Sequence, residues 1–450
     1  MKKFYLLLLV LFASFGLMAC QTEEGTQGIT KTEIIIGNTA ATSGLFAGVG
    51  IPFNLAMQVV FDDYNATHAG RKIVFKHYDD GFDGAQGLAY TKKLVEEDKV
   101  FALVGHFGTN TVNATMDYLL ESGVPMVYGV TGVNSLFYEN QVGNNILSVQ
   151  PIYRTEGRMM VARALHESIF GPNNNAKLGA EDKIVVLYSD DDAGQSIKLG
   201  ITDEVASAGI GSRVTYLPFS AATANAVASV AMSLNPQVYL LSSNQVPATA
   251  MATALRIAES TVPVLSSYVN GATVFTPAML DATTPLPYKV YANAWVDISD
   301  ATAPAPTAAQ IGGDGTLTGW AFGTDFTYLA GFTAEYWETF VHDMNSSTRT
   351  DGNTTAKSLW GNAYAIAGYI AAKTFVTLLD RVDLDTVTWE SFIAAAESAP
   401  VDLPMSGTIN WANGNRTGLS MLAVNQLLYT PTVSFKKLIG LEGIETVRAK

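Results

Sequence analysis

Short apolar runs alternate with amphipathic segments along the first half of the chain. The clearest run, 100–104, holds five apolar residues and ends at Gly105, which is typical of a strand buried on both faces of a parallel sheet. Helical spacing of apolar residues separates this run from its neighbours. We expect strands at 34–36, 72–78, 100–104 and 125–128, with helices at 52–65, 85–97 and 112–121.

A second series of the same kind begins near residue 183. Its expected strands are 183–188, 213–217, 237–241 and 263–266, and its expected helices are 194–208, 222–234 and 247–259. An Ala/Pro/Thr/Gly-rich connection at 301–325 precedes two long expected helices, 326–344 and 360–380. The pattern predicts an α/β protein with two doubly wound parallel-sheet lobes.

The first 20 residues have the pattern of a targeting segment and not of a folded element. Lys2 and Lys3 precede an apolar stretch at 5–17, and Leu17-Met18-Ala19-Cys20 resembles a bacterial lipobox, whose cysteine is acylated. The alternative is a plain secretory signal with an incidental cysteine. Residues 21–30 are polar and predict a flexible tether. Because Cys20 is the only cysteine, an internal disulfide is excluded.

Charge and motifs exclude several classes of function. Loss of Lys2 and Lys3 would reduce the 27 basic residues to 25 against 41 acidic ones, a net charge of −16. That balance argues against nucleic-acid binding and against a polybasic membrane surface. The chain has no Gly-x-Ser-x-Gly elbow, P-loop or His-Glu-x-x-His motif. We therefore expect no enzyme, no cofactor and no metal, and we expect His106 in a loop near a pocket.

The stretch 100–111 carries the candidate chemistry. A buried strand leads through Gly105 and Gly108 into Thr109, Asn110 and Thr111, and a helix follows. Its first N–H groups and its dipole would form a site for a carboxylate. The alternative is that one of these three polar residues only caps the helix.

Several motifs, taken in order and spacing, resemble the type I periplasmic binding proteins, and within them the branched-chain amino-acid-binding group that feeds ABC importers. These motifs are Gly-Asn-Thr-Ala-Ala-Thr-Ser-Gly (37–44), Val-Gly-His-Phe-Gly-Thr-Asn-Thr (104–111), Val-Pro-Met-Val-Tyr-Gly-Val-Thr-Gly (124–132), Tyr-Arg-Thr-Glu (153–156) and Met-Ser-Gly-Thr-Ile (405–409). The resemblance implies three crossings between lobes, near 148–152, 291–296 and 399–404. Lobe 1 would then comprise 31–149 plus 295–400, and lobe 2 would comprise 150–294 plus 401–450.

The resemblance also implies a ligand site between the lobes. Thr109 would receive the ligand carboxylate, helped by the backbone of Gly108 or Asn110. The exit of the next strand would contribute Thr131 with Gly129 or Val130. An aromatic wall position of the family falls on Val49, and Phe46 is the expected substitute. Further wall candidates, which could also be packing residues only, are Tyr128, Tyr153 and Tyr268, and Asn244 is a further candidate ligand-binding residue.

The family's ammonium site is altered in this chain. A tyrosine that packs on the ligand is replaced by Ala193, and the glutamate that pairs with the ammonium falls within 267–270, where there is no acid. Asp192 or Asp190 could supply the counter-charge, or they could be solvated caps. An α-amino acid needs both of its charges matched when it is desolvated. We therefore expect a small carboxylate-bearing solute, either an unusual apolar amino acid or an acid without an ammonium group.

The function implied is that of a monomeric extracytoplasmic lipoprotein anchored to the bacterial cell membrane. It would bind its solute by hinge closure and deliver it to the permease subunits of an ABC importer. The alternative is a ligand-sensing receptor subunit of the same fold that signals to a membrane partner.

Overall fold

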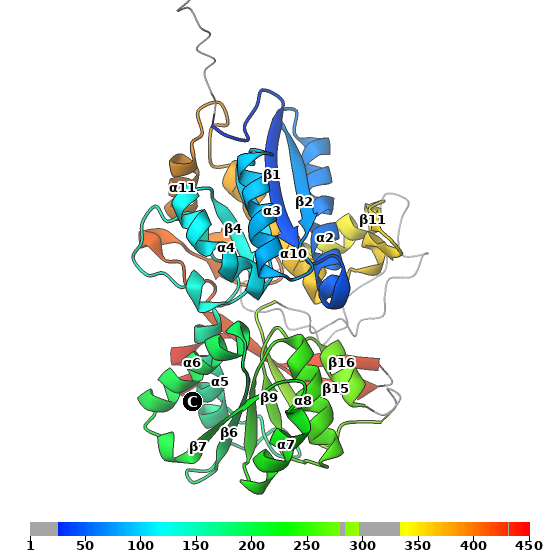
Figure 1. The fold of residues 1–450 in the computed structure, drawn as a ribbon, viewed down its shortest axis with the longest axis vertical. Helices are drawn as coiled ribbons and strands as arrows, with labels where there is room; N and C mark the ends of the chain where they lie inside the picture. The colour runs from blue at the N-terminus through cyan, green and yellow to red at the C-terminus, as the bar shows by residue number, and fades with distance from the viewer. Residues whose placement is uncertain (1–25, 280–283, 297–333, 431) are drawn as a thin grey trace, which may run out of the picture.

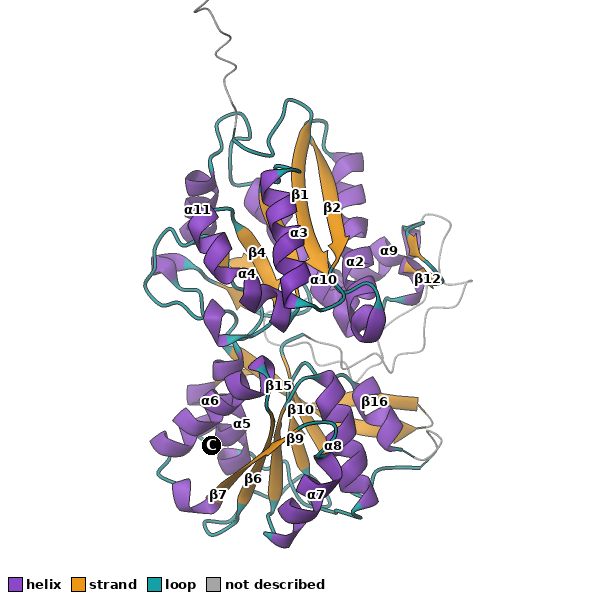
Figure 2. Cartoon of the chain, in the orientation of Figure 1, coloured by secondary structure: helices purple, strands orange, loops and turns teal. Residues whose placement is uncertain are grey.

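The computed structural model describes residues 26–279, 284–296 and 334–450 except 431. Within them, two separate sheets form the centres of two lobes, one above the other in Figure 1. The first sheet has the strand order β2-β1-β3-β4-β5, and the second has the order β16-β15-β10-β9-β8-β6-β7. Figure 2 shows helices on both faces of each sheet. The expected α/β fold of two doubly wound lobes is confirmed.

In the first lobe, parallel strands alternate with helices. The elements are β1 (Glu33–Ala40), η1 (Gly44–Phe46), α2 (Ala47–Thr67), β2 (Lys72–Asp79), α3 (Gly84–Glu96), β3 (Ala102–Phe107), α4 (Thr109–Ser122), β4 (Met126–Val130), η2 (Asn134–Leu136) and β5 (Ile146–Leu147). Later segments follow as α9 (Ala334–Ser346), the hairpin β11 (Thr350–Asp351) and β12 (Thr354–Thr355), η5 (Ala356–Ser358), α10 (Ala363–Leu379) and α11 (Trp389–Ser398).

The second lobe repeats this pattern and adds a hairpin. Its elements are α5 (Tyr153–His166), β6 (Ile184–Ser189), α6 (Asp192–Ser207), η3 (Gly211–Arg213), β7 (Val214–Phe219), α7 (Ala224–Ser233), β8 (Val238–Ser242), α8 (Gln245–Ile257), β9 (Val264–Ser266), η4 (Ala272–Ala278) and β10 (Val290–Ala294). The hairpin of β15 (Met421–Thr430) and β16 (Thr432–Gly443) joins β10 in antiparallel pairing, and α12 (Ile444–Arg448) ends the chain. The sequence pattern did not predict this hairpin.

Strand β3 extends past the glycine that was expected to end it. Gly105 has φ +64, and a Cβ built on it would lie 2.6 Å from the Phe53 ring. This glycine therefore allows α2 to pack closely on the sheet, and the strand continues to Phe107. The expectation of a loop position for His106 is consequently wrong, because His106 lies within β3 with no solvent exposure. Burial lowers the pKa of His106 to about 3.

Helix α2 shows why an apolar helix of this kind does not by itself indicate a membrane span. Among the described residues, the stretch Gly44–Thr67 is the one helix that is long and apolar enough to cross a membrane. Phe53, Leu55 and Met57 within it are almost fully buried in the core of the first lobe. It packs against α10, where a Cβ on Gly368 would lie 2.1 Å from the Phe53 carbonyl oxygen.

Residues 401–419 pack on the first lobe, although the resemblance assigned them to the second. They include the short pair β13 (Val401–Asp402) and β14 (Thr408–Ile409) and the turn η6 (Ala412–Gly414). Trp411 is fully buried in the first core, and its indole N–H donates to the Ser148 carbonyl at 2.9 Å. Arg416, equally buried, donates to the Asn144 carbonyl at 2.8 Å. The third passage between lobes therefore lies just before β15 and not at 399–404.

The second part of the flexible tether that was expected at 21–30 is not free in the structure. Gln27 donates from Nε2 to the carbonyls of Val95 (3.1 Å) and Val100 (3.0 Å), so the chain is attached to the first lobe here. Residues 21–25, Cys20 with the expected targeting segment, the connection 301–325 and the start of the expected helix 326–344 lie outside the described residues.

Candidate functional site

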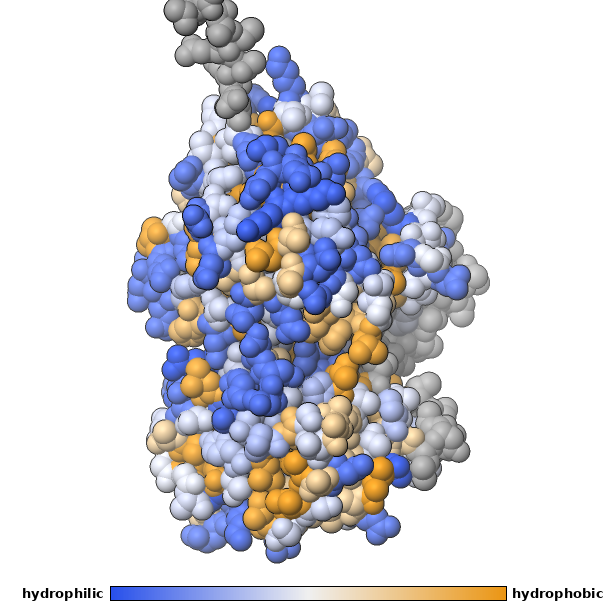
Figure 3. Space-filling view, viewed as in Figure 1, coloured by the Kyte–Doolittle hydropathy of each residue, from blue (hydrophilic) through white to orange (hydrophobic). Residues whose placement is uncertain are grey.

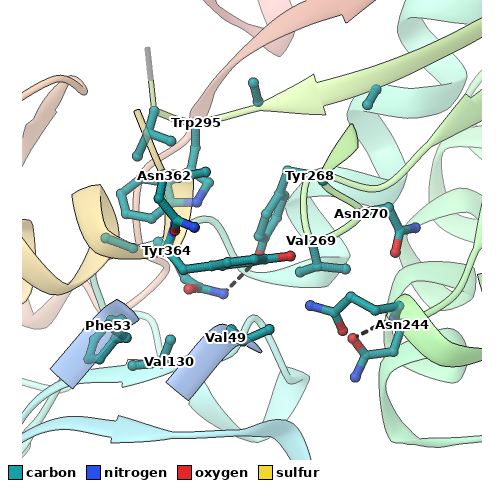
Figure 4. A pocket seen from close by; sticks show the side chains of 18 of the residues that line it. Val49, Phe53, Val130, Asn244, Tyr268, Val269, Asn270, Trp295, Asn362 and Tyr364 are labelled. Atoms are coloured by element: carbon teal, nitrogen blue, oxygen red, sulfur yellow. Dashed lines mark hydrogen bonds between the residues drawn. The ribbon is translucent and has the colours of Figure 1, made fainter. Parts of the chain in front are cut away.

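A cavity of about 500 Å³ lies between the two lobes, a size within the usual range of small-molecule sites. It is bordered by the strands β4 and β10, by the loops after β3, β8 and β9, and by the first turns of α2 and α10. Hydrophobic residues also gather on the surface at the waist between the lobes, on the right of Figure 3. Figure 4 shows side chains of both lobes around the cavity: Phe53, Val49 and Val130 from the first, and Val269, Asn270 and Asn244 from the second.

Helix α4 begins at the cavity without a side-chain cap. Its N-cap is Gly108 with φ +103, where a Cβ would lie 2.9 Å from the Phe82 ring. The alternative that Thr109, Asn110 or Thr111 caps the helix is therefore wrong. Gly108 and Thr109 line the cavity, so the positive end of the helix dipole is directed into it. This arrangement suits a carboxylate.

The Thr109 hydroxyl is held by neighbouring hydroxyls. Its Oγ1 lies 2.9 Å from Thr131 Oγ1 and 3.5 Å from the Tyr153 hydroxyl. The Thr131 oxygen also accepts from the Val133 N–H at 3.1 Å. Thr131 does not line the cavity but fixes the rotamer of Thr109 from behind.

A buried carboxylate supports the loop beside this helix start. Asp80 accepts hydrogen bonds from the Thr39 hydroxyl (2.8 Å), the Thr111 hydroxyl (2.9 Å) and the Phe82 N–H (2.8 Å). Burial raises its pKa, against the effect of these donors. Its contacts fix Phe82 against Gly108.

Aromatic rings form a continuous wall on the first-lobe side. Phe46 stacks on Phe82 with ring centroids 3.9 Å apart, and Phe82 meets Phe107 edge to face at 6.5 Å. Phe107 contacts Phe53, which in turn meets Tyr128 at 6.1 Å. Trp295 continues the series, with its ring 5.9 Å from that of Tyr128. All six line the cavity.

Polar side chains on the hinge side of the cavity form hydrogen bonds with one another. The Tyr128 hydroxyl donates to Gln150 Oε1 at 2.8 Å, and Gln150 Nε2 donates to the Tyr268 oxygen at 2.9 Å. The second of these bonds is the dashed line beside Tyr268 in Figure 4. Tyr268 donates to the Pro151 carbonyl at 2.6 Å. Burial raises the pKa of both tyrosines well above the usual value, so they stay neutral.

In the second lobe, Glu156 anchors the loop that carries Tyr268. Its carboxylate accepts from the Ser267 hydroxyl (2.7 Å), the Tyr268 N–H (2.7 Å) and Asn293 Nδ2 (3.3 Å). The side chain is fully buried on α5, and burial raises its pKa to about 7. The sequence did not mark this acid as part of the site, although it belongs to the Tyr-Arg-Thr-Glu motif.

The structure places seven of the expected binding residues on the cavity wall: Phe46, Gly108, Thr109, Tyr128, Tyr153, Asn244 and Tyr268. Four others do not line it. Asn110 is exposed on α4, Gly129 lies within β4, and Thr131 is behind Thr109. Asp192 is exposed and accepts from Asn113 Nδ2 at 2.8 Å, a bond between α6 and α4.

Other lining residues were missed, notably Gln150, Trp295, Asn362, which is the N-cap of α10, and Tyr364 in its first turn. They lie where the chain passes between the lobes and on a helix more than 200 residues from Thr109, and no local pattern marks them. The Tyr364 hydroxyl lies beside Gln245 and Gly271, whose hydrogen bonds oppose the rise in its pKa caused by burial.

The electrostatic character of the wall is neutral. Among the described residues that line the cavity there is no Asp, Glu, Lys, Arg or His. Asp190, the other expected counter-charge, accepts from Gln195 Nε2 at 2.7 Å on the surface of the second lobe. Within the described ranges, no group of three His, Cys, Asp or Glu side chains could hold a metal.

Two doubly wound lobes with a cavity between them define a solute-binding protein of the two-lobed periplasmic class. The chain belongs to the periplasmic binding protein family, whose model matches residues 33–426. No curated protein matches the chain significantly. Membership implies a solute-binding role and an extracytoplasmic location.

Solved structures agree with this fold. A fatty acid ABC transporter substrate-binding protein from Thermomonospora curvata is 16% identical, with a TM-score of 0.65 over 95% of this chain and 96% of that one. An R. palustris solute-binding protein in complex with benzoate is 14% identical, with a TM-score of 0.62 over 93% and 99%. A Desulfitobacterium hafniense substrate-binding protein in complex with Leu is 14% identical, with a TM-score of 0.60 over 90% and 99%.

Proposed function

We propose that this protein captures a small carboxylate-bearing solute, an amino acid or a related organic acid, between its lobes and delivers it to an ABC importer. The observation that carries the proposal is the uncapped start of α4 on a cavity whose described lining holds no charged side chain. A helix N-terminus stabilises an anion without a basic side chain.

The similar structures support a carboxylate-bearing ligand as a class, but they do not support one particular acid. The names of these proteins refer to a fatty acid, benzoate and leucine, all of which carry a carboxylate. Because the sequence identity to these proteins is low, the ligand of this chain has to be inferred from its own residues. Lobe closure would complete the site, because residues of both lobes line the same cavity.

A thermal-shift comparison of acids with their primary amides tests the carboxylate assignment. Benzoate, octanoate and 4-methylpentanoate would each be paired with the corresponding amide, which keeps the shape and removes the charge. We expect acids to raise the melting temperature more than their amides, because only the anion gains from the helix dipole. Equal stabilisation by amides would refute the assignment.

We further propose that the protein is a monomer anchored through an acylated Cys20 at the outer side of the cell membrane. Several acyl chains give a stable anchor, whereas one gives marginal binding. Fatty-acid labelling that is present in the wild type and absent in Cys20→Ser would support the anchor, and an unlabelled wild type would refute it.

A further inference from the structure

The first-lobe side of the cavity wall presents ring faces, whereas on the second-lobe side the amide oxygens of Gln245, Asn270 and Asn293 have no hydrogen-bond partner among the described residues. The six contacting rings from Phe46 to Trp295 run from the entry of α2 to the hinge. Tyr128 and Tyr268 contribute their rings, because their hydroxyls are already bonded to Gln150 and Pro151. A ligand against this wall would therefore meet mainly apolar surface.

Among the described residues, the carboxylates of Asp80, Glu156 and Asp192 are each hydrogen-bonded to groups outside the cavity. Asp80 is bonded to two hydroxyls and an N–H group, and Glu156 to three donors around Tyr268. Asp192 bonds Asn113 on the exposed surface. In the part of the lining that the structure describes, an ammonium group would be desolvated without a counter-charge, which is costly.

We infer that the ligand is an aromatic monocarboxylate without an ammonium group. This inference rests on the proposed function, since it takes the carboxylate to bind at α4. The ring lies against the Phe46–Trp295 wall, with the carboxylate at Gly108 and Thr109. Aromatic rings prefer offset-stacked or edge-to-face contact with one another, so this wall selects a ring over a saturated body of the same size.

Titration calorimetry with a matched set of ligands tests the inference on the wild-type protein. The set is 3-phenylpropanoate, L-phenylalanine (the same skeleton with an ammonium group) and 3-cyclohexylpropanoate (the same acid with a saturated ring). We expect 3-phenylpropanoate to bind at least about tenfold more tightly than L-phenylalanine, and more tightly than 3-cyclohexylpropanoate. Equal or tighter binding of either competitor would overturn the inference and leave the carboxylate proposal standing.

Titration with a cationic ligand distinguishes failure of the inference from failure of the proposed function. The aromatic wall could in principle attract a cation through its ring faces. If 2-phenylethylammonium binds more tightly than all three carboxylates, the proposed function fails together with the inference. If none of the three carboxylates binds, the inference fails, and the proposed function fails with it only when no acid of the thermal-shift set binds either.

A pair of variants localises the ring. Phe46→Leu removes one ring of the wall, and we expect it to weaken 3-phenylpropanoate about threefold to tenfold while changing 3-cyclohexylpropanoate less. Phe61→Leu is the matched control, because Phe61 packs on Phe75 at 5.6 Å in the first core and does not line the cavity. It should leave the ratio of the two affinities unchanged. An unchanged ratio in Phe46→Leu, or the same change in both variants, would overturn the inference.

Discussion

Glu156 is a carboxyl group that the second lobe buries without a basic partner in hydrogen-bonding contact. Its three donors are a hydroxyl, a backbone N–H and an amide, and burial still raises its pKa from 4.5 to about 7. Because the folded-state pKa exceeds the unfolded one, the folded protein binds more protons between these values. The resulting stability is complete below about pH 4.5 and is lost as the pH rises through 7.

The Glu156→Gln variant should remove this pH dependence. Relative to the variant, the wild type should lose about 3 kcal/mol of unfolding free energy between pH 4.5 and pH 8. Denaturant unfolding of both proteins across that range provides the measurement. If the difference between them does not change with pH, or changes in the opposite sense, the raised pKa of Glu156 is contradicted.

At the residue scale, the sequence predicted which residues form the site better than it predicted their contacts. The pattern of a buried strand that leads into small hydroxyl residues indicated the helix start, the resemblance assigned Thr109 and Gly108 to it, and both line the cavity. The sequence could not predict that Gly108 is the N-cap, because that depends on the contact with Phe82 from another loop. Nor could it predict that Asp192 bonds α4, which lies in the other lobe.

At the element scale, hydrophobic spacing predicted most strands and helices, since each lobe repeats one local unit. Helices α5 and α11 were not predicted, and two further exceptions depend on contacts that are distant in the sequence. Strand β3 continues through Gly105 because α2 packs against that glycine. The hairpin of β15 and β16 was missed, because its pairing partner β10 lies more than 100 residues earlier.

The close packing of α10 on α2 yields a stability prediction. In Gly368→Ala the new methyl group would meet the Phe53 carbonyl at 2.1 Å, so the helices must separate. We expect a loss of about 1–3 kcal/mol in unfolding free energy.

Gly48→Ala is the control for this change. It lies in α2, and a Cβ added there would have no heavy atom within 4 Å, so alanine should be neutral or stabilising by up to about 1 kcal/mol. Denaturant unfolding without ligand distinguishes the two. Equal effects at both positions would show that α10 and α2 are not packed in this way.

At the scale of the whole molecule, the two lobes meet beside the cavity as well as at the hinge. Asn113 on α4 donates to Asp192 on α6, and Asn134 of η2 donates from Nδ2 to the Ser196 carbonyl at 3.2 Å. These contacts favour the arrangement of lobes seen in Figure 1. The three-crossing topology was expected from the resemblance alone, but the expected position of the third crossing, 399–404, was wrong, because residues 401–419 pack on the first lobe.

Loss of the Asn113–Asp192 bond should shift the ligand-free protein towards more open forms. For Asp192→Ala we expect a change of about twofold to fivefold in the ratio of open to closed forms, because one exposed hydrogen bond contributes about 0.5–1 kcal/mol. Small-angle scattering should show a larger radius of gyration. Asp190→Ala, which removes an exposed carboxylate bonded within the second lobe, should not change it. The same radius for wild type and Asp192→Ala would contradict this role.

The central claim is that the start of α4 and the Thr109 hydroxyl bind the solute's carboxylate. Its most direct test is calorimetric titration of benzoate and benzamide with wild type, Thr109→Val and Thr131→Val. Both substitutions break the same 2.9 Å bond between hydroxyls, but only Thr109 lines the cavity. We predict that Thr109→Val weakens benzoate binding by about tenfold to a hundredfold and benzamide far less, because a charge-assisted bond is lost. Thr131→Val should retain the preference for the acid. If Thr109→Val binds benzoate like wild type, or weakens acid and amide equally, the carboxylate does not bind there.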